Sequence, residues 1–175
     1  METDKIVYRE IESPIGKFII GATDKGCSIS EFSDRGGIDR INRRIEKRYK
    51  AELIPGNNQF IDQMEEEFNL YFEKKLKIFI TPLDYKGTPF QISVWEELLK
   101  IPYGETCSYG QIAKRLGKPG AMRAVGKANG DNYLPIVIPC HRVIEATGKL
   151  RGYGGGLWRK KYLLELESNN LNLFA

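Results

Sequence analysis

Leu134-Pro-Ile-Val-Ile-Pro-Cys-His-Arg-Val143 is the stretch around which the rest of the chain is organised. Its apolar run, residues 136–138, is typical of a short buried strand or extended segment, and the flanking prolines disfavour a helix. The run leads to Cys140, which is followed by His141, the only histidine, and by Arg142. A thiol beside a base and a permanent cation predicts a reactive cysteine, and an exposed cation would be a poor neighbour for an inert one. The alternatives are a cysteine that fills the core and a histidine with a structural role.

The composition is that of an ordinary globular chain. Of its 175 residues, 41% are hydrophobic and 29% are charged, which allows one large domain or two small ones. The charged start and the lack of a long apolar run lead us to expect neither a signal peptide nor a membrane span. Three cysteines are an odd and sparse set, so we expect a reducing compartment, the cytoplasm, or the nucleus in a eukaryote. With one histidine and no paired cysteines, we expect no metal site.

The positive charge is concentrated in the second half of the chain. The formal net charge is +4, but residues 86–175 hold 13 Lys and Arg against 7 Asp and Glu, hence +6. Residues 1–85 hold 14 against 16, hence −2. This asymmetry fits contact between the second half and a polyanion, and the alternative is a set of lysines that only keeps the surface hydrated.

The first part of the chain predicts a small α/β unit. Strand patterns cover residues 5–12, 17–23, 27–32, 51–54 and 78–80, and helical patterns cover residues 39–49 and 58–75. No chemistry is evident there, because Glu65-Glu66-Glu67 is typical of a hydrated helix face rather than a metal site, and Cys27 of packing. A polar link with two prolines, residues 81–89, marks a domain boundary, which we place between residues 82 and 83.

The second part is predicted to be mostly helical. Helical patterns cover residues 88–100, 109–116, 121–129 and 157–167. Ser108 is a good N-cap for the second of these helices, and Gly117 suits its end. Helix, short turn and helix form the helix-turn-helix pattern, although an ordinary αα-hairpin has the higher base rate. Small residues and the cations Arg123 and Lys127 on the following helix favour DNA binding.

The segment Pro139-Cys-His-Arg-Val143 resembles the active-site signature of the O6-alkylguanine-DNA alkyltransferases. The resemblance covers about residues 89–167, and further matching positions occur in order: Asn132, Pro135, Tyr153, the three glycines of residues 154–156, and Glu167. It implies DNA repair by one irreversible, stoichiometric transfer of the alkyl group of O6-alkylguanine, with O4-alkylthymine as a further candidate substrate, from a flipped-out nucleotide to Cys140.

The resemblance also implies a fold of the α+β or α/β class. A small N-terminal α/β domain of ribonuclease H-like type (residues 1–82) would precede a mostly helical winged helix-turn-helix domain (residues 83–175). We expect duplex DNA containing O6-alkylguanine as the partner, no cofactor, no membrane and a monomer.

Four catalytic roles are carried over by the resemblance. Cys140 is the nucleophile, His141 takes its proton through a water, and Glu167 orients His141. Tyr109 donates a hydrogen bond to the purine as it leaves. Taken alone, Glu167 would be read as an exposed carboxylate at a helix end, and Tyr109 as a core aromatic.

The resemblance assigns a further group of positions to substrate and DNA. Arg123 fills the gap left by the extruded base, and the backbone near Gly154 reaches O6. The complete set is Arg123, Asn132, Pro135, Val143, Tyr153, Gly154, Ala124, Lys127 and Ser108. The sequence departs from many relatives at Tyr133, where they have proline, which leaves the rigidity of that turn open.

Three other classes of protein remain open from the residues alone. They are an alkylated-DNA binding protein that transfers nothing, a helix-turn-helix regulator, and a Cys-His hydrolase with turnover.

Overall fold

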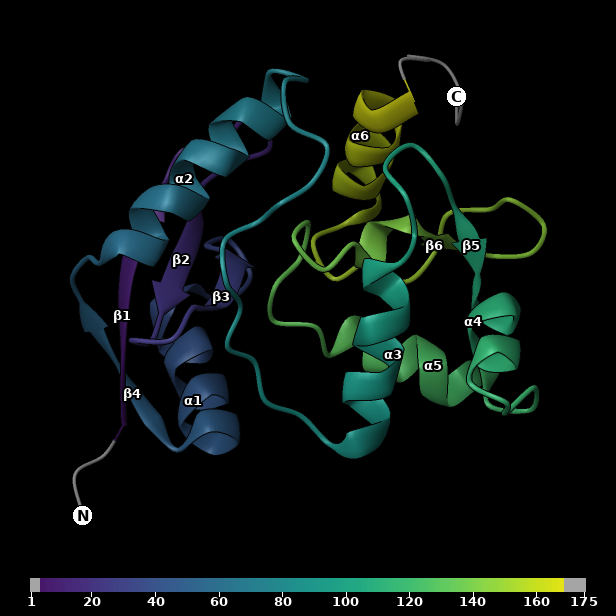
Figure 1. Ribbon diagram of the computed structural model, residues 1–175, viewed down its shortest axis with the longest axis horizontal. Helices are drawn as coiled ribbons and strands as arrows, with labels where there is room; N and C mark the ends of the chain where they lie inside the picture. Colours follow the sequence, from purple (N-terminus) through teal and green to yellow (C-terminus); the bar gives the residue numbers. More distant parts are fainter. Residues whose placement is uncertain (1–3, 169–175) are drawn as a thin grey trace. The chain divides into compact units, whose positions relative to one another are not determined.

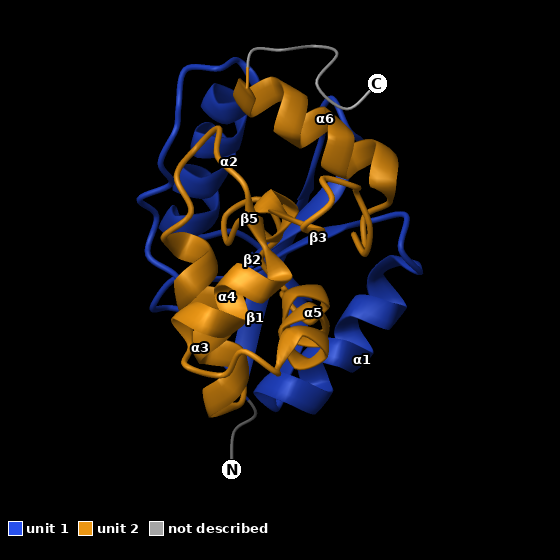
Figure 2. Cartoon of the chain, turned by 90° about the vertical axis from the view of Figure 1, so that its right-hand side faces the viewer, with its two compact units in different colours: residues 1–86 blue, residues 87–175 orange. Residues whose placement is uncertain are grey.

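A computed structural model gives the structure of residues 4–168. The chain divides into two compact units, residues 1–86 and residues 87–175, coloured separately in Figure 2. Within the described residues, no helix is both long enough and apolar enough to pass through a membrane.

The first unit is built on a four-stranded sheet of order β3-β2-β1-β4 (Figure 1). Strand β1 (Asp4–Ile11) pairs antiparallel with β2 (Phe18–Ala22) and parallel with β4 (Ala51–Pro55), and β2 pairs antiparallel with β3 (Cys27–Phe32). Helix α1 (Gly37–Tyr49) joins β3 to β4, and α2 (Gln59–Phe72) follows β4. Sheet and helices share one core, with fully buried side chains from Ile6, Phe18, Ile20, Ile41, Ile45 and Phe68.

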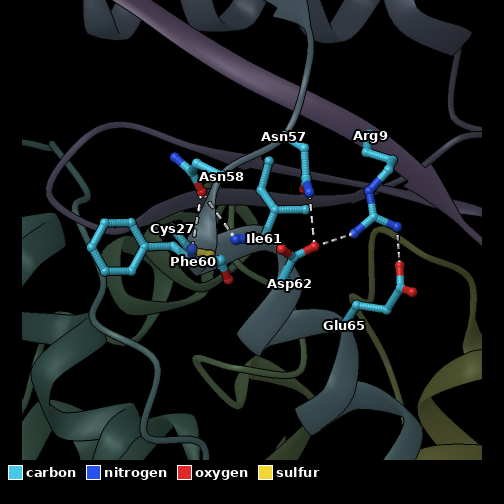
Figure 3. Close-up of polar contacts among 8 residues, drawn as sticks. All are labelled: Arg9, Cys27, Asn57, Asn58, Phe60, Ile61, Asp62 and Glu65. Atoms are coloured by element: carbon cyan, nitrogen blue, oxygen red, sulfur yellow. Dashed lines mark hydrogen bonds and ion pairs between the residues drawn. The ribbon is translucent and has the colours of Figure 1, made fainter.

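The first turn of α2 is fixed by polar side chains (Figure 3). The Asn58 side-chain oxygen accepts hydrogen bonds from the amides of residues 60 and 61, at 3.0 and 3.1 Å, which is why the helix begins there. Arg9 of β1 forms ion pairs with Asp62, at 3.3 Å, and with Glu65. The helix is thereby held against the sheet by charge as well as by apolar packing.

The end of the first unit differs from the sequence prediction. The sequence predicts that Glu67 is hydrated, but it is buried, with 5% of its surface exposed. Its carboxylate accepts hydrogen bonds from the amides of Ile80 (2.6 Å) and Thr81 (2.8 Å). Residues 78–80 form no strand, and the predicted strand is wrong: the side chains of Ile78 and Ile80 are 71% and 74% exposed. A buried carboxylate holds this segment instead of a strand partner.

The link that follows is hydrogen-bonded to the first unit. The Cys27 amide donates to the Pro82 carbonyl, and the Asp84 amide donates to the Cys27 carbonyl, both at 2.8 Å. The Ser28 hydroxyl donates to the Asp84 carbonyl at 2.5 Å. The division after residue 86 therefore falls four residues beyond the boundary expected from the prolines.

The second unit is mostly helical (Figure 1). Its elements are α3 (Pro89–Leu99), β5 (Cys107–Ser108), α4 (Tyr109–Arg115), α5 (Met122–Gly130), the 3₁₀ turn η1 (Cys140–Arg142), β6 (Val143–Ile144) and α6 (Leu157–Ser168). Strands β5 and β6 pair in parallel. The predicted N-cap is confirmed: the Ser108 hydroxyl accepts from the Gln111 amide, and the Gln111 side chain accepts from the Ser108 amide. Gly117, with φ +69°, lies just after α4 in the conformation expected of it.

The apolar run before the cysteine is buried, as predicted, but it forms a tight turn rather than a strand or extended segment. Asn132 closes it from both sides, accepting from the Leu134 amide and donating to the Ile138 carbonyl, each at 2.9 Å. The Ile138 amide donates to the Leu134 carbonyl at 2.9 Å. Ile136 adopts φ +76°, a region that β-branched residues seldom occupy. The turn delivers the chain to Cys140 at a fixed angle.

Candidate active site

Cys140 begins the 3₁₀ turn η1 and is 5% exposed. Its amide donates to the Ile138 carbonyl at 2.7 Å. Its own carbonyl accepts from the Val143 amide and, at 3.3 Å, from the Asn129 side chain of α5. The backbone of the thiol-bearing residue is therefore fixed on both sides.

The buried carboxylate of Glu167, on α6, contacts both residues that follow the cysteine. His141 Nε2 lies 2.7 Å from Glu167 Oε2, and Arg142 donates to Glu167 Oε1 from Nε at 2.8 Å and to Oε2 from Nη2 at 3.1 Å. Arg142 Nη1 also donates to the Ile101 carbonyl at 2.7 Å. All three side chains are buried. The expectation of an exposed cation beside the thiol is therefore wrong, as is the residue-type reading of Glu167 as an exposed carboxylate.

The charges of this cluster fix the roles of the imidazole nitrogens. Burial alone would raise the pKa of Glu167, but His141 and Arg142 outweigh it and hold that pKa well below its usual value. An ionised Glu167 is an acceptor, so Nε2 of His141 carries the hydrogen of their shared bond. His141 Nδ1 is buried and has no hydrogen-bond partner among residues 4–168. That nitrogen is the one left to accept a proton.

Lys160 belongs to this site, and the sequence analysis missed it. The side chain is fully buried on α6, and Nζ donates to the carbonyls of Val143 (2.5 Å) and Arg151 (2.9 Å). Burial lowers the pKa of Lys160 to about 8, against the opposing effect of Cys140. A signal was present in the sequence, since Lys160 and Glu167 are seven residues apart and share the inward face of α6 with Leu163.

Tyr109 lies beside Lys160, and its hydroxyl donates to the Arg151 carbonyl at 3.3 Å. Lys160 Nζ is 6.0 Å from the centre of the Tyr109 ring. Burial raises the pKa of Tyr109, and the nearby Cys140 and Glu145 add to this effect, so the phenol keeps its proton. The structure thus brings Tyr109, Lys160 and Cys140 into one electrostatic neighbourhood.

A cavity of about 670 Å³ opens beside α4 and α5. Ser108, Tyr109, Met122 and Arg123 line it, together with the turn of residues 145–147. Cys140 is not among the lining residues. The cavity therefore brings together two of the positions assigned to substrate or DNA, Ser108 and Arg123, and the catalytic candidate Tyr109.

The remaining predicted positions are spread over α5 and two turns. Ala124 is exposed on α5, and Lys127 Nζ forms an ion pair with Asp131 at 3.2 Å. Tyr153 is 9% exposed and precedes a turn closed by a hydrogen bond from the Gly156 amide to its carbonyl at 3.0 Å. Gly154 is exposed in that turn. Pro135 lies in the turn braced by Asn132, in an isolated bridge with Ile138.

Comparison with known proteins gives this geometry its context. A family profile described as "6-O-methylguanine DNA methyltransferase, DNA binding domain" matches residues 89–169. A methylated-DNA–protein-cysteine methyltransferase of Mycobacterium tuberculosis is 45% identical over 167 residues, covering 94% of this chain and 93% of the relative. The chain belongs to the methylated-DNA–protein-cysteine methyltransferase family.

Other members of the methylated-DNA–protein-cysteine methyltransferase family match over a similar extent. The protein of that name from Methanosarcina barkeri is 45% identical and covers 94% of this chain and 98% of its own length. A crystal structure described as the Mycobacterium tuberculosis OGT in complex with DNA superposes with a TM-score of 0.80, at 43% identity and 94% coverage of each chain. Both units are thus within the extent of the match.

Proposed function

We propose that this protein repairs DNA as a methylated-DNA–[protein]-cysteine S-methyltransferase. It transfers the alkyl group of O6-alkylguanine, in a nucleotide flipped out of duplex DNA, to Cys140 in a single turnover. The observation that carries the proposal is the buried contact of 2.7 Å between His141 and Glu167, directly after Cys140, in a chain of this family. The Mycobacterium tuberculosis relative described in complex with DNA supports the same partner.

The reaction is a displacement at carbon. His141 Nδ1 accepts the thiol proton, through a water in the scheme that the family resemblance implies, and Glu167 stabilises the imidazolium. The Cys140 sulfur forms a bond to the alkyl carbon while the carbon–O6 bond breaks, and its electron pair moves to the guanine. Tyr109, which keeps its proton, donates a hydrogen bond to the departing purine. The thioether product has no easy reverse, so each molecule reacts once.

Contacts to the substrate base follow from the same scheme. The carbonyls of Cys140 and Val143 receive the exocyclic amine, Gly154 offers its amide to O6, and Tyr153 lines the base. Asn132 and its hydrogen bonds to the turn around Pro135 support this assignment, because they fix where the thiol segment begins. Lys160, bound to the Val143 carbonyl, holds the same wall of the site.

The duplex itself is assigned to α4 and α5. Arg123 takes the place of the extruded base, while Ser108, Ala124 and Lys127 face the backbone. Exposure of Arg123 beside the 670 Å³ cavity supports the arrangement.

We infer that the two units act as two domains, the first ribonuclease H-like and the second a winged helix-turn-helix domain. The mixed sheet with β1 and β4 in parallel supports the former, and the sequence α4, turn, α5 supports the latter. Three free cysteines support action in the cytoplasm, or in the nucleus if the source is a eukaryote.

Intact mass spectrometry tests the proposal. After mixing with a duplex containing O6-methylguanine, the protein gains one methyl group, located on Cys140, and the Cys140→Ala variant gains none. An unchanged mass together with tight binding would instead identify an alkylated-DNA binding protein without transfer. Repeated turnover with an unmodified thiol would identify a hydrolase.

A further inference from the structure

Helix α1 carries a concentrated positive charge on an otherwise acidic unit. Residues 37–50 hold six Lys and Arg against two Asp and Glu, hence +4. The other residues of 1–86 hold nine against fourteen, hence −5. A field of one sign in so short a segment attracts polyanions locally, whatever the net charge of the unit.

Three of these cations form one stripe, Arg43, Lys47 and Lys50, here called the α1 stripe. Their spacing of four and three residues places them on one face of the helix. All three are exposed and, together with Glu46, line a hollow of about 490 Å³. No side-chain hydrogen bond or ion pair joins Arg43, Lys47 or Lys50 to another residue of 4–168. Within the described residues, these three cations therefore neutralise no acidic side chain through an ion pair.

Structural roles account for other cations of this region but not for the whole stripe. Arg44 and Arg35 form ion pairs with the buried Glu31, at 2.6 and 3.0 Å. Cations in the last turn, such as Lys47, favour the helix dipole. Arg43 lies too early in the helix for that effect, because the dipole acts within the last turn. The stripe therefore has more positive charge than the fold requires.

We propose that the α1 stripe binds the phosphates of duplex DNA outside the damaged nucleotide. At about 1.5 Å per residue, the stripe extends over about 10 Å of helix axis. One DNA strand presents about one phosphate per 3.4 Å of its axis, so the stripe matches about three phosphates. The contact is independent of the lesion and gives the first unit a function in holding the duplex. It shares its partner with the proposed repair reaction but uses none of that chemistry.

The test measures binding to an unmodified 30-base-pair duplex by fluorescence anisotropy over a range of salt concentrations. The triple variant Arg43→Gln, Lys47→Gln, Lys50→Gln should bind at least tenfold more weakly at about 0.1 M salt. Its plot of log affinity against log salt should be shallower by about 2.7, which is about 0.9 for each of three phosphates. Glu46→Gln should have the opposite effect and tighten binding severalfold.

The control is Lys5→Gln, Lys17→Gln, Lys25→Gln, three exposed lysines of the same unit. It removes the same charge away from the stripe and should change the affinity by less than threefold. Equal losses in both triple variants would show a net-charge effect and overturn the proposal, as would an unchanged salt slope in the stripe variant. The proposal would also be overturned if the stripe variant lost binding to anionic vesicles but bound DNA as well as the wild type does.

The repair reaction is measured separately, as alkylation of each variant by free O6-benzylguanine. That rate should be the same in the wild type and the stripe variant. If the wild type itself fails to react with O6-benzylguanine, the proposed function fails while the binding result still decides the α1 stripe.

Discussion

Replacing Glu167 by glutamine tests the charge at the centre of the site. The substitution keeps the size of the side chain but turns an acceptor-only carboxylate into a neutral amide. One of the two carboxylate oxygens becomes an NH2 donor, so the substitution removes the acceptor of either His141 Nε2 and Arg142 Nη2 (2.7 and 3.1 Å, at Oε2) or Arg142 Nε (2.8 Å, at Oε1). The hydrogen bonds that remain are no longer assisted by the negative charge. Arg142 stays buried and keeps its hydrogen bond to the Ile101 carbonyl at 2.7 Å.

Two losses of different size follow from this geometry. Removing one member of a buried ion pair costs about 3–5 kcal/mol, a large part of a typical unfolding free energy of about 5–15 kcal/mol. General-base catalysis contributes about 10²- to 10⁴-fold to a rate, and His141 depends on the Glu167 carboxylate to stabilise its protonated form. We therefore expect Glu167→Gln to lower both the unfolding free energy and the alkylation rate by these amounts.

Denaturant unfolding and the rate of reaction with O6-benzylguanine measure the two effects. Glu165→Gln on the same helix is the matched control, because its pair with Lys161, at 3.9 Å, is worth at most about 1 kcal/mol. Adding Arg142→Met to Glu167→Gln removes the stranded cation, so stability should partly return while the rate stays low. A single variant as stable and as reactive as the wild type would refute the reasoning, and so would a double variant that regains the full rate.

Three further predictions concern neighbouring residues. The pKa of Lys160 is lowered from 10.5 in the unfolded chain to about 8 in the folded protein. Between these two pH values the unfolded chain holds one more proton than the folded protein, so a rise in pH favours the folded protein. The unfolding free energy of the wild type, relative to that of Lys160→Met, should therefore rise from about pH 8 to about pH 10.5. Asn132→Ala should cost about 2–3 kcal/mol in denaturant unfolding, because it leaves an amide and a carbonyl of the turn unpaired, whereas Asn57→Ala at an exposed contact should cost under about 1 kcal/mol. Arg123→Ala should slow repair of duplex DNA at least tenfold more than reaction with free O6-benzylguanine, and equal losses would remove its role in base extrusion.

Local signals in the sequence predicted most of the secondary structure. Ser108 and Gly117 mark the limits of α4 through side-chain and backbone preferences that act within a few residues. The apolar pattern of residues 78–80 predicts a strand, whereas the segment is held by hydrogen bonds to the distant Glu67. The apolar pattern of residues 136–138 likewise does not reveal the turn, because the turn depends on both ends of the Asn132 amide.

The sequence predicts the part of the site that is formed by adjacent residues. The distant partner, Glu167, is predicted only by the family resemblance. Cys140 and His141 are neighbours in sequence, but their chemistry depends on Glu167, whose contact with His141 no local pattern revealed. Arg142 was misjudged for the same reason, since a buried arginine requires a buried acceptor that lies far along the chain. Lys160 is not predicted to be in the site from its residue type, because lysines are seldom fully buried, yet its side chain is fully buried on α6.

The carboxylate that completes the site follows the thiol by 27 residues, from Cys140 to Glu167. A ribosome that adds about 5–20 residues per second takes about 1–5 s to cover that interval. During synthesis the sulfur therefore exists before the helix that equips its neighbouring imidazole. For a protein that reacts once, this order means that the contact between His141 and Glu167 can act on the thiol only after α6 has been made.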